Sequence, residues 1–135
     1  MLVFINKNNF NSENYLILKR DTFIKIGEYK KAIEHLDQFD LDDEVIAPMA
    51  KGALGDAFLQ INSPDEALGY FENAIQISNN SFTTPKYLLK AAITALDINK
   101  PQVALEYLER INEEFPAAAE AKQAKALIGK AQGLL

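Results

Sequence analysis

Few side chains in this chain could do acid–base or metal chemistry, and their spacing does not favour it. His35 is the only histidine, and the sequence contains no cysteine. A single imidazole cannot complete a metal site or a catalytic triad, because both need several converging groups. The lack of cysteine also excludes disulfides, thiolate metal sites and cysteine nucleophiles. We therefore predict no catalytic residue, no metal ligand and no cofactor, and interpret His35 as a partly exposed helix residue.

An acidic run at residues 40–44, Asp-Leu-Asp-Asp-Glu, comes nearest to a calcium loop. An EF-hand needs carboxylates at positions one, three and five, a glycine at six and a glutamate at twelve. This run lacks the glycine and the final glutamate, so a loop that caps the next helix explains it better. Gly52 and Gly55 fall inside a predicted helix with no strand before them, unlike the glycines of a phosphate loop. The sequence therefore predicts that the chain is not an enzyme.

The bulk composition is that of a globular domain, with 135 residues, 48% of them apolar and 24% charged. The net charge is −5 and no block of lysine and arginine is present, so we expect no nucleic-acid partner. No apolar run reaches the roughly 18–20 residues of a membrane span, and no signal peptide fits the start. We expect no membrane insertion by this chain itself. The compartment stays open: cytoplasmic by default, and periplasmic or membrane-tethered if a longer gene product carries an anchor.

The elements that would position any site are organised by short turns. In the central turn, Asn62 tolerates a left-handed backbone and can end a helix. Ser63 and Glu66 have the spacing of a capping box, and Pro64 would occupy the first helical position, where its missing N–H costs nothing. The sequence therefore predicts a helical hairpin that turns at this point.

Similar turns are expected at Gly27 and Asn99, which lie 35 residues before and 37 residues after Asn62. Periods of this size predict stacked helical pairs. In the first pair we expect a helix to end at Gly27 and a second to begin at Glu28 or Tyr29. We predict an irregular lead-in over residues 1–11 and a single repeat domain over 12–135, with units at about 12–43, 44–81 and 82–116 and a capping helix at 117–132.

The second unit carries the most complete repeat motif, Leu54-Gly55-Asp56-Ala57-Phe58 followed by Ala67, Phe71 and Ala74. These positions resemble the Leu-Gly-x-x-Tyr, Ala, Phe/Tyr and Ala pattern of the tetratricopeptide repeat, a helix–turn–helix unit of 34 residues. The first unit departs from it, with Lys19-Arg20 where Leu-Gly is usual. The resemblance covers roughly residues 12–132. It implies an all-α fold, a right-handed α-α superhelix of about three helical hairpins plus a C-terminal capping helix.

A second resemblance rests on Val45-Ile46-Ala47-Pro48, Gly55-Asp56 and the segment Tyr87-Leu88-Leu89-Lys90-Ala91 after a polar loop. These features resemble the C-terminal region of membrane-anchored bacterial repeat proteins of the YfgM kind. This resemblance implies a bacterial protein and, as one alternative, the soluble part of an envelope- or secretion-associated protein.

The tetratricopeptide resemblance implies a binding surface on the concave face, lined by the first helix of each pair. Asp21 and Asp56 stand where repeats that clamp a C-terminal carboxylate carry asparagine, which disfavours that function. The face is apolar with scattered charges, which suits an amphipathic helix or an extended apolar segment of a partner. By register, the predicted groove residues are Ile17, Asp21, Ile24, Met49, Asp56, Leu59, Gln60, Lys86, Leu89, Lys90, Ile93, Leu96 and Asp97.

Two functions follow from this surface. The first is a non-catalytic protein–protein interaction module that binds a peptide or helix of a partner protein. The alternative is a structural or assembly role, in which the apolar faces mediate homo-oligomerisation. The same groove residues could also simply pack on the lead-in or on another copy of the chain.

Overall fold

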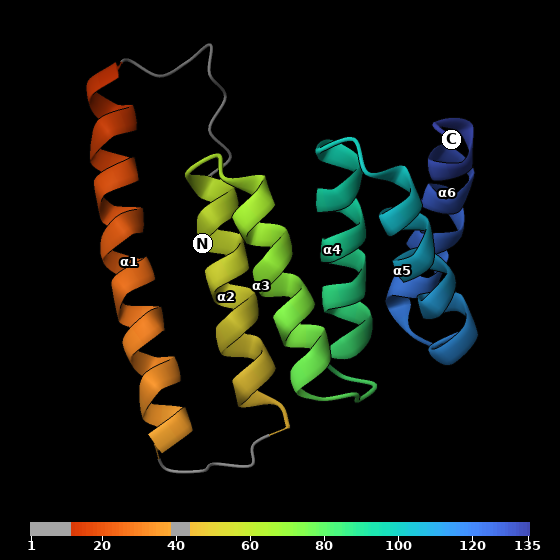
Figure 1. Ribbon diagram of the computed structural model, residues 1–135, viewed down its shortest axis with the longest axis horizontal. Helices are drawn as coiled ribbons and strands as arrows, with labels where there is room; N and C mark the ends of the chain where they lie inside the picture. Colours follow the sequence, from red (N-terminus) through yellow and green to blue (C-terminus); the bar gives the residue numbers. More distant parts are fainter. Residues whose placement is uncertain (1–11, 39–43) are drawn as a thin grey trace.

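The computed structural model describes residues 12–38 and 44–135. All regular structure in these residues is α-helical, which confirms the predicted all-α helical-repeat fold. The helices lie side by side in chain order, each antiparallel to the one before it (Figure 1). They are α1 (Ser12–Gln38), α2 (Ile46–Gln60), α3 (Pro64–Ile77), α4 (Thr84–Asp97), α5 (Pro101–Glu114) and α6 (Ala119–Gly133).

The turns after α2 and α4 are built alike. Asn62 and Asn99 each have a φ of 60°, the left-handed conformation expected of them. After α2, the Ser63 N–H donates to the Phe58 carbonyl at 2.8 Å and the Asn62 N–H donates to the Leu59 carbonyl at 3.1 Å. This is the bonding of a Schellman motif, which satisfies the last carbonyls of a helix. The α2–α3 and α4–α5 hairpins therefore turn where the sequence predicted.

The capping box predicted at the start of α3 is wrong. Ser63 is the N-cap residue and Pro64 lies in the first turn, as expected, but no side chain caps the helix. Ser63 has a φ of −120° and a ψ of 67°, away from the extended geometry in which an N-cap hydroxyl usually meets the N–H groups of the first turn. Its backbone carbonyl accepts the Ala67 N–H instead, at 3.1 Å.

The break predicted at Gly27 is also wrong, because α1 is one continuous helix of 27 residues. No glycine in the described part of the chain adopts a positive φ. The residues after Gly27 also lack a proline that could open a second helix, as Pro64 and Pro101 open α3 and α5. A glycine alone weakens a helix without ending it. The predicted lead-in and most of the acidic loop lie outside the described residues.

The core runs through the whole row of helices. Small side chains lie where helices cross, and Ala67, Ala91 and Ala104 are fully buried. Large side chains such as Phe71 and Leu108 fill the space between neighbouring helices. At the far end, α6 turns a row of alanines toward α5 and exposes lysines on its other side, as the predicted capping helix should. None of the described helices is long and apolar enough to span a membrane.

Candidate functional site

The predicted groove residues lie on α1, α2 and α4, and many of them are exposed or half-exposed. Met49 and Leu59, on α2, are 43% and 39% exposed, which is unusual for large apolar side chains. On α4, Ile93 is half-buried, and Leu89 and Leu96 pack partly against the core. The α4 members therefore contribute to stability as well as to the surface.

Asp56 and Lys90 form an ion pair that joins α2 to α4. The Lys90 ammonium donates to both carboxylate oxygens of Asp56, at 2.7 and 2.8 Å. Both side chains are about 30% exposed, so the pair is partly screened by solvent. The two residues are 34 positions apart, close to one repeat. Two predicted groove residues from successive hairpins are thus in direct contact.

Two aromatic rings lie next to this ion pair. The Lys90 ammonium is 5.8 Å from the centre of the Phe71 ring, and the Phe71 and Tyr87 rings stack with their centres 6.4 Å apart. The Lys86 ammonium lies 5.5 Å from the centre of the Tyr87 ring. Tyr87 is only 3% exposed, and burial, with a smaller contribution from the Asp56 charge, raises the pKa of its hydroxyl. The lysines of α4 therefore rest on a buried aromatic layer.

Two glycines of α2 make room for that layer. A β-carbon at Gly52 would overlap the Tyr87 ring, and one at Gly55 would overlap the Phe71 ring. The prediction of groove residues omitted Tyr87. The three-residue spacing of the two glycines indicates that something bulky packs on α2, but it does not say which side chain does so.

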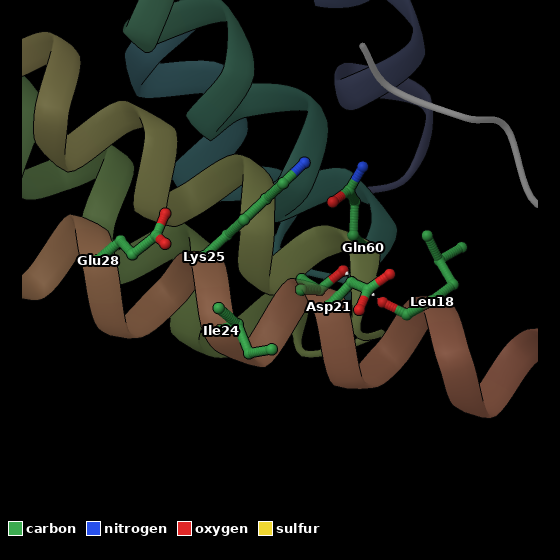
Figure 2. A pocket seen from close by; sticks show the side chains of 7 residues that line it. Leu18, Asp21, Ile24, Lys25, Glu28 and Gln60 are labelled. Carbon is green, nitrogen blue, oxygen red and sulfur yellow. Dashed lines mark hydrogen bonds between the residues drawn. The ribbon is translucent and has the colours of Figure 1, made fainter.

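A half-open hollow of about 400 Å³ lies between α1 and α2. It brings together three predicted groove residues, Asp21, Ile24 and Gln60, and Figure 2 shows the α1 residues beside Gln60 of α2. The prediction did not include the other residues of its lining, because a hollow depends on how α1 and α2 pack, which helix register alone does not give. The other residues are Leu18, Thr22, Lys25 and Glu28.

A second contact between successive hairpins lies outside the predicted groove. The Tyr107 hydroxyl of α5 donates to the Glu72 carboxylate of α3 at 2.7 Å, across 35 positions. Burial raises the pKa of Tyr107, and the hydrogen bond to Glu72 and its charge raise it further. This contact joins the second helices of two hairpins, as Asp56 and Lys90 join the first helices.

Acid–base or metal chemistry finds little support in the described residues. Among them, no group of three or more His, Cys, Asp or Glu side chains could hold a metal ion. The side chain of His35 lies outside the part of α1 whose side chains are described. The exposed features of the predicted groove are instead apolar side chains, the Asp56–Lys90 ion pair and the half-open hollow.

Residues 21–82 match the family model described as a tetratricopeptide repeat. The match confirms the predicted resemblance of this part of the chain to tetratricopeptide repeats. The match begins within α1 and covers the whole α2–α3 hairpin. Tetratricopeptide repeats generally mediate interactions between proteins and are typically not catalytic. No curated protein matches the sequence, and the resemblance to YfgM-like proteins stays a prediction.

Proposed function

We propose that this chain is a non-catalytic protein-binding module, which takes a peptide or helix of a partner protein along the face shared by α2 and α4. The observation that carries the proposal is the set of apolar side chains that stay partly exposed around the Asp56–Lys90 pair. Met49 and Leu59 contribute from α2, and Ile93 contributes from α4. Apolar surface rimmed by charge is typical of protein-binding sites.

The arrangement suits a partner segment with one apolar side. An amphipathic helix or an extended strand of apolar residues would cover Leu59 and Ile93, while polar side chains at its edge meet Asp56 and Lys90. Since those two charges already neutralise each other, the partner needs no strong charge of its own. Affinity would come mainly from buried apolar area at the centre of the contact.

The test compares binding by single variants of tagged, full-length chain. Leu59→Lys and Ile93→Glu should each abolish co-purification of partners from a cell extract, because each places a charge in the apolar contact. Ile77→Lys is the matched control, since Ile77 is 43% exposed but lies on α3. Circular dichroism should show that all three variants remain folded. If both groove variants retain the partners that the unaltered chain captures, the face is not the binding site.

The alternative is a structural role in which the chain assembles with itself. Light scattering on the purified Leu59→Lys variant separates the two functions, because assembly through the face shared by α2 and α4 would be weakened and the mean mass would fall below that of the unaltered chain. Loss of the partner in the Leu59→Lys variant without a change in mean mass would favour the binding module.

A further inference from the structure

The outer side of α1 carries apolar side chains that no described helix covers. Of the helices in the described part of the chain, only α2 packs extensively on α1. Thr22 and Ile26 are buried there. Phe23 is 53% exposed, and Ile24, which also borders the hollow between α1 and α2, is 57% exposed. Two neighbouring large apolar side chains at this exposure indicate a contact surface rather than a solvated face.

Gly27 lies one turn after these two residues, in the interior of α1. It neither forms a turn nor seats another side chain, and a β-carbon built on it meets nothing within 4 Å. In this it differs from Gly52 and Gly55, which make room for aromatic rings. Glycine weakens a helix relative to alanine, and no described side chain uses the space that Gly27 leaves. A second helix that approaches closely would use it.

Two other glycines, Gly69 and Gly129, also occupy open helical positions. The residues within one turn of either include no exposed large apolar side chain. Gly133 is open too and lies beside the exposed Leu134 and Leu135, but it is the last residue of α6. Among the described glycines in the interior of a helix, only Gly27 is both open and within one turn of exposed large apolar side chains.

The charges around Gly27 are complementary to those of a second α1 that runs in the opposite direction. If a two-fold axis passes at Gly27, residues equally far from it on either side face each other. Arg20 then faces Glu34, both seven residues from Gly27 and therefore on the same side of the helix. Phe23 faces Lys31, whose stem and ammonium can cover an aromatic ring. Each pair occurs twice, because the contact is symmetric.

The side chains involved are available for such pairing. Arg20 is 72% exposed, and its ion pair with Asp21 is long, at 3.8 Å. Lys31 and Glu34 are exposed as well. We propose that two copies of this chain associate through the outer faces of their α1 helices, packed antiparallel about Gly27. A single helix pair buries a small area, so the dimer forms and dissociates reversibly with concentration.

The first test is the mass of the full chain by sedimentation and light scattering over a wide range of concentration. The mean mass should rise from monomer toward dimer. Gly27→Glu should raise the dissociation constant by about tenfold or more, because it brings two carboxylates together at the axis. Gly69→Glu and Gly129→Glu are matched controls and should leave the dissociation constant unchanged. A mass that stays monomeric at every concentration, or an equal effect of all three glycine variants, would overturn the proposal.

The second test exchanges the charges. Arg20→Glu alone and Glu34→Arg alone should each weaken the dimer, because like charges then face each other twice. An equimolar mixture of the two variants should restore association, since the carboxylate introduced in one copy would then meet the guanidinium introduced in the other. Failure of the mixture to associate more strongly than either variant alone would contradict the antiparallel register about Gly27.

This inference does not depend on partner binding by α2 and α4. Leu59→Lys and Ile93→Glu should leave the dissociation constant of the dimer unchanged, and Arg20→Glu should leave partner capture unchanged. The two proposals can therefore fail separately.

Discussion

The ring of Tyr87, on α4, occupies the space that a β-carbon at Gly52, on α2, would need. Phe71 of α3 stands in the same relation to Gly55, and the two rings stack on each other. The two hairpins thus meet through an aromatic layer that fits only against a helix with no side chain at these two positions. The spacing of α2 and α4 in turn sets how far apart their exposed side chains lie.

Gly52→Ala should lower the free energy of unfolding by about 1–3 kcal/mol, because the buried Tyr87 ring must shift to admit a methyl group. Urea denaturation measures this change. Gly69→Ala is the matched control: nothing lies within 4 Å of its β-carbon, and alanine favours the helix, so stability should rise by up to about 1 kcal/mol. Equal effects of the two substitutions would show that helix propensity, rather than the ring, determines the outcome.

The ion pair between Asp56 and Lys90 should contribute modestly to the stacking of the two hairpins. A double-mutant cycle with Asp56→Ala and Lys90→Ala should give a coupling energy of about 0.5–1 kcal/mol, since both side chains are partly exposed. The coupling should shrink in about 1 M salt, where surface charges are screened. A coupling near zero at low salt would mean that the lysine acts only through the Phe71 ring.

The turns of this fold were predictable where the signal is local. Asn62 and Asn99 precede residues that can open a helix, with a proline two positions on, and both turn as expected. Gly27 shares the repeat spacing but has no proline after it, and α1 continues through it. Repeat spacing alone therefore does not end a helix. A helix ends where a residue in the left-handed conformation is followed by a residue that can begin the next helix, as Pro64 and Pro101 do.

The candidate surface was predictable only in part. Register placed Asp56 and Lys90 on the first helices of successive hairpins, but their pairing depends on how the hairpins stack, which the sequence does not state. Tyr87 was missed because its role comes from a glycine 35 positions earlier. The hollow beside Asp21 was missed because it depends on how α1 and α2 pack, and nearly all of its α1 lining precedes Gly27.

The stability of the fold should fall as pH rises above about 10, through Tyr107. Burial and the Glu72 carboxylate raise the pKa of Tyr107 in the folded chain above its ordinary value near 10. The unfolded chain therefore loses the proton first, and ionisation favours unfolding. The contribution of Tyr107 is complete below about pH 10 and is lost as the pH rises toward the pKa of the folded form. Urea denaturation at pH 8 and pH 11 measures the loss.

Two variants isolate this contribution from other groups that titrate at high pH. Tyr107→Phe should lose less stability than the unaltered chain between pH 8 and pH 11. Glu72→Gln should also lose less, because an amide oxygen still accepts the hydrogen bond while the negative charge is gone. If both variants lose as much stability as the unaltered chain, the contact between α3 and α5 is not the cause.

The side-chain amide of Asn80 holds the loop between α3 and α4, because it hydrogen-bonds both within the loop and to the Glu44 carbonyl just before α2. Its carbonyl oxygen accepts from the backbone N–H groups of Phe82 and Thr83 at 2.9 and 2.7 Å. Its NH₂ group donates to the Glu44 carbonyl at 2.9 Å, and to the hydroxyls of Ser78 and Thr83. Asn80 thus fixes the turn before α4 and ties it to the start of α2.

Asn80→Ala should lower the free energy of unfolding by about 1–3 kcal/mol, because it leaves several partly buried groups without partners. Asn80→Asp separates the two halves of this role, since a carboxylate still accepts from the turn but cannot donate to Glu44. Hydrogen exchange should show the Phe82 and Thr83 amides protected in Asn80→Asp and exposed in Asn80→Ala. If the Phe82 and Thr83 amides exchange equally fast in the two variants, the hydrogen bond from Asn80 to the Glu44 carbonyl orders the loop, and the Asn80 carbonyl oxygen does not. That hydrogen bond would then be what places the first turn of α4 beside α2.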